Sequence, residues 1–171
     1  MTKGFVVMGL RSKAPISDVK GFLAKVAQLS KDLGIEVQLV DASKVYGKEH
    51  LEVAAERALR AFEEGRNSGN TVAVEVLRYA SCKRQISKAI KFMGLKDGTD
   101  TIGAVLIFAH SGKVPKDLLG VLGLVRDDKV LEGTSAVLEA FGITSDMRKG
   151  VPRARWSDLI LEKVALMDIE K

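Results

Sequence analysis

The most constraining feature of this sequence is an unbroken apolar run, IGAVLIFA, at residues 102–109. Its length and its valine and isoleucine content are typical of a strand that neighbouring elements cover completely. The run is far shorter than a membrane span would need. The fold class therefore depends on which elements surround this strand.

The surrounding segments predict both strands and helices. Residues 4–10 read as a second buried strand, and residues 35–40 alternate apolar and polar side chains, as a half-buried strand does. Ser17 is a predicted N-cap, apolar residues at helical spacing follow it, and Gly34 ends that helix. Further helices are predicted at residues 50–64, 83–93, 116–124, 135–141 and 157–166, a strand fragment at 130–131 and a basic loop at 147–156.

These elements follow no regular βαβ rhythm along the chain. We therefore predict an α+β fold, in which a small, mostly antiparallel or mixed sheet is covered by several helices. The length of 171 residues suits a single domain, residues 1–171, with a sizeable core. Residues 71–80 (TVAVEVLRYA) are ambiguous, because their β-branched residues favour a strand. Their apolar spacing suits a helix capped by Ser68 or Asn70, and we favour the helix.

Charge and cysteine content narrow the class of protein. The chain carries 27 Lys and Arg against 22 Asp and Glu, a net charge of +5, which suits either a polyanionic partner or ordinary surface solvation. A single cysteine excludes an intrachain disulfide and, with only two histidines, a Cys/His zinc cluster. The short apolar run at the N-terminus fits neither a signal peptide nor a membrane span. We expect a cytoplasmic protein that contacts no membrane and holds no metal or cofactor.

Candidate catalytic residues are isolated from one another. His110 follows the apolar run and is either a base or, more simply, a hydrogen-bonding loop residue. His50 is expected to be solvated in the first turn of its helix. The positive charges of Lys83 and Arg84 would lower the thiol pKa of Cys82, but no histidine or acid in that segment completes a nucleophilic site. We therefore expect a protein without catalytic activity.

Residues 79–95 (YASCKRQISKAIKFMGL) combine a basic and an apolar surface and contain no acid. If one helix spans this segment, Arg84, Lys88 and Lys91 share one face. The opposite face then carries Ile86, Ala89, Ile90 and Met93. The like charges repel each other by about 0.2–0.5 kcal/mol per pair. Either a bound anion or acids from elsewhere in the fold would relieve this repulsion, and the sequence leaves both open.

A second basic cluster lies near the C-terminus. Its members are Arg148, Lys149, Arg153 and Arg155, and Trp156 follows them directly. Arginines interleaved with an aromatic ring can clamp phosphates and stack a base. A tryptophan just before a terminal helix is more often an anchor in the core, and we favour that interpretation.

The stretch VEVLRYASCKRQISKAIKFMGLKDG resembles the kinase-binding subunit of the KEOPS (EKC) complex, a TPRKB-type family. The matching positions are Glu75, Leu77, Tyr79, Ala80, Ser81, Arg84, Gln85, Ile86, Ser87, Ala89, Ile90 and Gly94. The resemblance extends from about Asn70 to Phe108, and the element order is compatible along most of the chain. Members of this family usually have Gly where this chain has Cys82. Because Gly permits a left-handed turn, Cys82 predicts either a right-handed turn or a strained one.

The resemblance implies a non-catalytic α+β protein that binds the atypical kinase/ATPase subunit of the complex. The complex installs a threonylcarbamoyl group on an adenosine beside the tRNA anticodon, and archaeal members of the family bind the single-stranded 3′ CCA end of the tRNA. The residues that we expect to contact this RNA are Lys83, Arg84, Gln85, Lys88 and Lys91. The candidates for the kinase contact are Ile86, Ile90, Met93, Leu161, Met167 and Ile169. Core positions are the simpler expectation for Ile86 and Ile90.

Three functions are compatible with these sequence features. The first is tRNA recruitment within the KEOPS complex, whose other subunits would be met indirectly through the kinase. The second is a protein–protein adaptor that activates the kinase without contacting RNA. The third is a small enzyme that uses Cys82 or His110. We rank them in this order.

Overall fold

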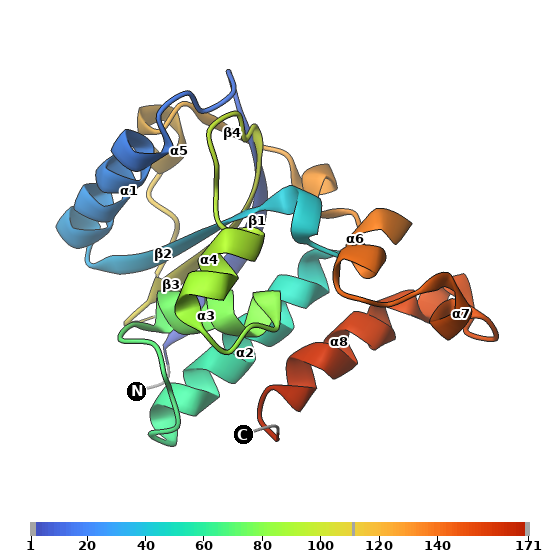
Figure 1. Cartoon of the computed structure of the whole chain (residues 1–171). Coiled ribbons are helices and arrows are strands. Elements are labelled where there is room, and N and C mark those ends of the chain that lie inside the picture. The colour runs from blue at the N-terminus through green and yellow to red at the C-terminus, as the bar shows by residue number, and fades with distance from the viewer. Residues whose placement is uncertain (1–2, 111, 170–171) are drawn as a thin grey trace.

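The structure, a computed structural model, describes residues 3–110 and 112–169. Its centre is a four-stranded sheet in the order β2-β3-β1-β4 (Figure 1). Each neighbouring pair is antiparallel, which confirms the predicted α+β class. The strands are β1 (Gly4–Ser12), β2 (Ile35–Asp41), β3 (Thr101–Phe108) and β4 (Leu124–Arg126).

Helices cover both faces of this sheet. The helices are α1 (Val19–Leu33), α2 (Lys48–Glu63), α3 (Val72–Ser81), α4 (Ile86–Met93), α5 (Leu118–Val121), α6 (Ser135–Ala140), α7 (Ser145–Arg148) and α8 (Trp156–Leu166). Three 3₁₀ turns join them: η1 (Ala42–Lys44), η2 (Asp128–Leu131) and η3 (Arg153–Arg155). Figure 1 shows α1 on one side of the sheet and α2 and α3 on the other, with α8 lying along α2. Within the described residues, none of these helices has the length and apolar character that crossing a membrane requires.

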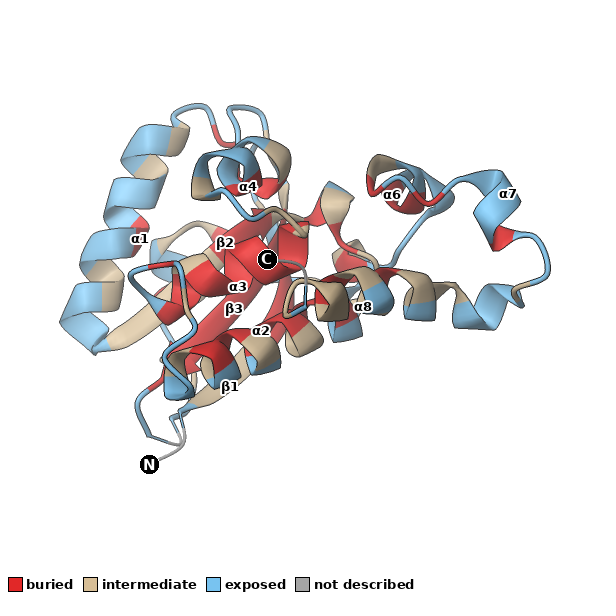
Figure 2. Cartoon of the chain, turned by 60° about the horizontal axis from the view of Figure 1, so that its bottom comes forward, coloured by how far each residue is buried: buried red, intermediate tan, exposed pale blue. Residues whose placement is uncertain are grey.

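The apolar run at residues 102–109 forms β3, which lies between β2 and β1. Alternate side chains of this strand serve two different cores. Ile102, Leu106 and Phe108 pack on the side of α1, while Val105 and Ile107 pack on the side of α2 and α3. Both faces of β3 are therefore buried, as the colouring of Figure 2 shows, and this explains why the run contains no polar residue.

Residues 71–80 are helical, as favoured above. Thr71 caps α3, since its hydroxyl accepts a hydrogen bond from Val74 N at 3.2 Å, so the predicted caps Ser68 and Asn70 were wrong. The helix is buried nearly all round, and only Val74 among its residues escapes the buried class. Packing against α2 and the sheet outweighs the strand preference of its valines.

Other predicted boundaries shift for local reasons. Asp18, not Ser17, caps α1, because its carboxylate accepts from Gly21 N at 3.1 Å. Gly34 ends α1 in the left-handed conformation with φ 65°, as predicted. The segment at 130–131 lies in η2, so the predicted strand fragment was wrong.

The fourth strand lies in a segment that was predicted to end a helix. Residues 124–126 form β4 and pair with β1, with Arg126 opposite Leu10. Two adjacent acids fasten the turn that follows: Asp127 N donates to Gly9 O at 2.9 Å, and Asp128 Oδ1 accepts from Gly9 N at 2.9 Å. These contacts with β1 draw the chain into the sheet.

The C-terminal third of the chain adds a small core of its own. Val137, Leu138, Phe141, Ile143 and Ile160 form this cluster. Trp156 packs against it and donates from Nε1 to Val151 O at 3.1 Å, which confirms its role as an anchor. The predicted basic loop at 147–156 is not irregular, since it contains the end of α7, the turn η3 and the start of α8.

Candidate nucleic-acid interface

The basic segment is a turn followed by a helix. α3 ends at Ser81 and α4 begins at Ile86, so Lys83, Arg84 and Gln85 precede the helix. The prediction that Arg84, Lys88 and Lys91 share one helical face was therefore wrong. The cause is Cys82, which adopts the left-handed conformation with φ 55° and ψ 32°. Its N–H donates to Tyr79 O at 3.1 Å, and the next N–H donates to Arg78 O at 3.3 Å. Of the two alternatives for Cys82, the strained turn is therefore the one observed.

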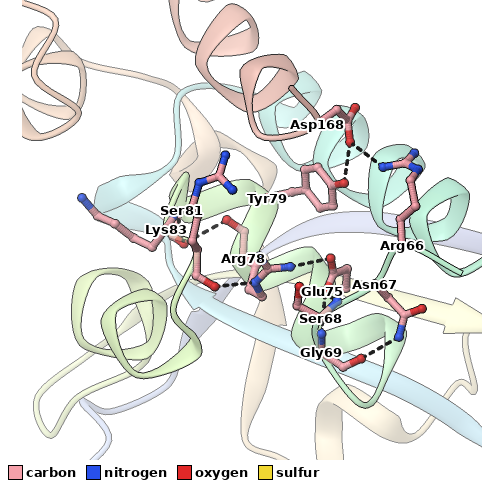
Figure 3. Close-up of polar contacts among 11 residues, drawn as sticks. Arg66, Asn67, Ser68, Gly69, Glu75, Arg78, Tyr79, Ser81, Lys83 and Asp168 are labelled. Atoms are coloured by element: carbon pink, nitrogen blue, oxygen red, sulfur yellow. Dashed lines mark hydrogen bonds and ion pairs between the residues drawn. The ribbon is translucent and has the colours of Figure 1, made fainter. Parts of the chain in front are cut away.

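Two buried charged residues hold this turn in place (Figure 3). Arg78 Nε donates to Arg84 O at 2.7 Å, and its Nη1 donates to Glu75 Oε1 at 2.6 Å. The other oxygen of Glu75 accepts from Gly69 N at 2.7 Å and from Ser68 N at 3.2 Å. The Glu75–Arg78 pair was not predicted from the sequence. An acid and an arginine three residues apart in an otherwise apolar helix were the available signal.

Three of the four cations of this segment are exposed. Arg84, Lys88 and Lys91 are exposed, while Lys83 is half-buried and its Nζ lies 4.8 Å from the centroid of Phe92. Within residues 3–110 and 112–169, none of the four lies within 4.0 Å of a carboxylate. Acids from elsewhere in the described fold therefore do not relieve their repulsion. Gln85 is exposed beside them.

An apolar groove of about 280 Å³ lies along helix α4, and none of the four cations is among its lining residues. It runs between α1, β2, α3 and α4, and its walls include Leu23, Val37, Leu39, Leu77, Ile86 and Ile90. Ile90 is 53% exposed and Ile86 is half-buried, so the core position that we favoured for Ile90 was wrong. Met93, by contrast, is fully buried with the side chains of α2 and α3 and presents no surface to a kinase.

The remaining kinase candidates lie on and after α8. Leu161 is half-buried against the small C-terminal core, and Met167 is half-buried against the core of α2 and α3. Ile169 is 74% exposed. Asp168, which lies between Met167 and Ile169, accepts hydrogen bonds from Tyr79, Arg57 and Arg66. Burial alone would raise the pKa of Asp168, but these bonds outweigh it and hold the pKa below its ordinary value.

The isolated catalytic candidates occupy structural positions. His50 is completely buried, contrary to the expectation of a solvated residue, and burial lowers its pKa to about 4. Burial also raises the thiol pKa of Cys82 to about 12, which reverses the expectation of an activated thiol. His110 lies exposed beyond β3. Among the described residues, no three His, Cys, Asp or Glu side chains gather as a metal site requires.

The second basic cluster is largely compensated by neighbouring acids. Arg148 is buried and bonds to Glu139, Lys149 pairs with Asp146 at 2.7 Å, and Arg155 pairs with Asp158 at 2.9 Å. The guanidinium of Arg153 lies 5.7 Å from the centroid of Trp156. This cluster therefore offers less unpaired charge than the segment 83–91 does.

Two comparisons with known proteins bear on this geometry. The family model described as "Kinase binding protein CGI-121" matches residues 16–168. The regulatory protein Cgi121 of Methanocaldococcus jannaschii is 28% identical over 144 residues, which cover 82% of this chain and 88% of that protein. The family match includes strands β2, β3 and β4, the residues that line the groove and the basic turn, whereas β1 precedes it. The chain therefore belongs to the CGI-121 family of kinase-binding proteins.

Proposed function

We propose that this protein is a non-catalytic, cytoplasmic subunit of the KEOPS complex that binds the complex's atypical kinase and recruits tRNA through its single-stranded 3′ CCA end. The observation that carries the RNA part is a set of four cations, half-buried Lys83 and exposed Arg84, Lys88 and Lys91, that have no carboxylate partner among the described residues. Helix α4, which carries Lys88 and Lys91, also lines an apolar groove. A polyanion that supplies both phosphates and flat apolar surfaces matches this combination.

The two halves of the interface have different tasks in this proposal. Phosphates contact the cations, which gives affinity without reading sequence. An unstacked base enters the groove between α1 and α4, where Leu23 and Ile90 offer aliphatic surface and Gln85 reaches a base edge. A duplex presents its bases stacked and paired, so the groove favours a single-stranded end.

The family description makes a kinase a partner of this protein. We assign that contact to the C-terminal side, where Leu161 and Met167 are partly exposed and Ile169 is 74% exposed. This leaves the groove available to RNA while the kinase is bound. A subunit that contacts both partners at once can present tRNA to the complex.

Binding of tRNA with and without its CCA end tests the RNA part directly. Wild-type protein should bind full-length tRNA with an affinity that falls with salt, with a log–log slope of about −2 to −4 for three or four phosphate contacts. Arg84→Ala/Lys88→Ala should weaken binding strongly, and removal of the CCA end should remove most of it. Equal binding of intact and truncated tRNA would show that the site is not a CCA site.

A matched control distinguishes tRNA binding at this site from a general effect of the protein's positive charge. Lys149→Ala/Arg155→Ala removes two cations that pair with acids, so it should leave tRNA affinity nearly unchanged. The kinase should still bind Arg84→Ala/Lys88→Ala in a pull-down.

The competing function is an adaptor that activates the kinase without RNA, with the groove holding a kinase side chain. The 53% exposure of Ile90 in an apolar groove is the observation that favours it. In that case Arg84→Glu/Lys88→Glu would leave tRNA modification by the assembled complex unchanged.

A further inference from the structure

A pocket that two lysines line lies beside the basic turn and is separate from the apolar groove. Its volume is about 200 Å³, and it opens where the end of α3 meets α8. Its lining includes Ser81, Cys82, Lys83, Phe141, Lys163 and Met167. None of these residues lines the apolar groove.

Both lysines line this pocket together with Cys82. Burial raises the thiol pKa of Cys82, and the positive charges of Lys163 and Lys83 oppose part of that rise. In the described part of the chain, neither lysine comes within 4.0 Å of a carboxylate. Two like charges therefore share one pocket without an observed counter-charge.

An aromatic ring packs against the side chain of Lys83, and Lys163 stands on a packed helix. Lys83 lies over the ring of Phe92, which in turn packs edge-on against Phe141 with 5.0 Å between ring centroids. Its backbone N–H donates to Ser81 Oγ at 3.3 Å. Lys163 stands on α8 directly before Val164, which is fully buried in the main core. Fixed cations bind an anion at a lower entropic cost than mobile ones do.

We propose that the pocket between Lys83 and Lys163 binds a phosphate group. Two ammonium groups give a phosphate oxygen two charge-assisted hydrogen bonds, and the Ser81–Cys82 turn closes the site behind it. The phosphate is either a backbone phosphate of RNA or a free phosphate or pyrophosphate. The RNA alternative rests on the proposed function. It would extend the tRNA contact from Arg84, past Lys83, onto α8.

Helix ends offer the competing explanation. Lys83 follows the last turn of α3 and Lys163 lies in the last turn of α8, where cations are favourable without any ligand. A purely structural role predicts no preference for anions in the pocket. The test therefore measures anion attraction, and stability serves only as a check on folding.

Cys82, the chain's single cysteine, provides a reporter inside the pocket. Its alkylation by iodoacetate, an anion, is compared with alkylation by neutral iodoacetamide, and the ratio of the two rates is referred to that of glutathione. Two ammonium groups near the sulfur should raise the ratio about fivefold. Lys163→Gln and Lys83→Gln should each lower it. The ratio cancels the change that each variant makes in the thiol pKa, because both reagents attack the same thiolate.

Protection by anions completes the experiment. Pyrophosphate should slow alkylation of the wild-type protein by both reagents and should protect Lys163→Gln far less. Lys149→Gln, which removes a cation that pairs with Asp146, is the matched control and should behave as wild type. Thermal melting confirms that each variant is folded. A ratio equal to that of glutathione, or protection that survives Lys163→Gln, would overturn the proposal.

Repeating the protection experiment with tRNA in place of pyrophosphate identifies the source of the phosphate. Protection by tRNA at far lower concentration than by pyrophosphate, lost in Lys163→Gln, supports an RNA backbone phosphate in the pocket. Protection by pyrophosphate but not by tRNA supports the pocket as a site for a free phosphate compound, and tRNA recruitment through Arg84 and Lys88 is then decided by the binding test described above. The two proposals can therefore fail separately.

Discussion

Tyr79 and Asp168 join the middle of the chain to its C-terminal segment: the tyrosine hydroxyl donates to Asp168 Oδ1 at 2.5 Å (Figure 3). Arg57 and Arg66 bond to the same carboxylate, so donors from α2, from the loop after it and from α3 converge on one acid. This contact fixes Met167, which lines the pocket beside Lys83 and Lys163. The C-terminal segment thus helps to shape the surface around the basic turn.

Asp168→Asn should destabilise the protein by about 1–2 kcal/mol at neutral pH, because two arginines lose their charged acceptor at a partly exposed site. The wild-type pKa of Asp168 is lowered, so its stabilisation is present above the unfolded pKa of about 3.9 and is lost as pH falls through the folded pKa. Denaturant unfolding near pH 7 and near pH 3 measures both effects. The variant should show a smaller loss of stability between these two pH values than wild type.

Tyr79 gives a second readout of the same contact. Burial, followed by the hydrogen bond and charge of Asp168, raises the pKa of Tyr79 to about 12. In Asp168→Asn the phenol pKa should fall towards its ordinary value, because the ionised phenolate no longer faces a carboxylate. Alkaline titration by tyrosinate absorbance checks this in a Tyr46→Phe background, which leaves a single tyrosine. An unchanged pKa would mean that the two side chains do not interact in solution.

His50 should make stability depend on pH in the weakly acidic range. Its Nε2–H donates to Ala80 O at 2.8 Å, while Nδ1 accepts from Tyr46 N at 3.1 Å, so the buried ring has no free position for a second proton. Burial lowers the folded pKa of His50 to about 4, below the ordinary histidine pKa of 6.5. The stabilisation is therefore complete above about pH 6.5 and is lost as pH falls towards 4.

The expected loss for wild type is about 2 kcal/mol between about pH 7.5 and pH 5. Guanidinium unfolding at these two pH values measures it. His50→Gln, which cannot take up a proton, should be less stable near pH 7.5 but should lack this part of the pH dependence. An equal pH dependence in wild type and variant would mean that His50 titrates normally.

Local sequence patterns predicted the parts of the fold that depend on local periodicity. The apolar run of β3, the helix ended by Gly34 and the helical state of residues 71–80 were all confirmed. The strand β4 was missed, because its three residues are too short for a periodic signal and pair with β1 far along the chain. His50 was placed in solvent because its neighbours Lys48 and Glu49 are charged, whereas its partner Ala80 lies thirty residues away.

In the candidate site, too, the features that depend on neighbouring residues were predicted, and those that depend on distant residues were not. The cations at 83–91 were recognised as unpaired within their own segment, and their exposure follows from that segment's composition. Their arrangement was wrong, because the helix starts only at Ile86. The left-handed Cys82 and the Glu75–Arg78 pair set this arrangement. The spacing of the pair was visible in the sequence, but the bond from Arg78 to Arg84 O was not.

Cys82→Gly should be more stable than Cys82→Ala by about 1 kcal/mol. The φ of 55° strains any residue with a Cβ atom, and glycine removes that strain, whereas alanine keeps it and also loses the packing of the sulfur. In a helix interior the order would be reversed. Denaturant unfolding of the two variants gives the difference, and a more stable alanine variant would contradict the left-handed turn.

Arg78→Met should weaken tRNA binding although Arg78 is buried. Loss of the guanidinium frees Arg84 O and leaves Glu75 as a buried charge without its partner, at a cost of about 3–5 kcal/mol. The turn that displays Lys83 and Arg84 then loses its brace. A filter-binding assay at a temperature where the variant remains folded measures the affinity.

Arg78→Met/Glu75→Gln serves as the control for that experiment. It should recover much of the stability, because the unpaired buried charge is gone, but not the tRNA affinity, because the brace on Arg84 O is still missing. Recovery of both together would mean that the single variant acts only through stability.

Ile90→Ser separates the apolar from the charged half of the interface. The substitution removes aliphatic surface from the groove without changing charge, so tRNA affinity should fall while the slope of log affinity against log salt stays unchanged. Arg84→Ala should instead reduce the magnitude of that slope by about 0.7–0.9, the share of one phosphate contact. Titrations of tRNA at several salt concentrations measure both quantities.

Ile169→Ser is the matched apolar control, because Ile169 is also exposed but lies on the C-terminal side assigned to the kinase. It should weaken kinase binding and leave tRNA affinity unchanged, whereas Ile90→Ser should do the opposite. If Ile90→Ser weakens kinase binding and spares tRNA, the groove is a protein-docking site and the adaptor function is the correct one. Because both substitutions replace isoleucine by serine on an exposed surface, neither difference can come from charge.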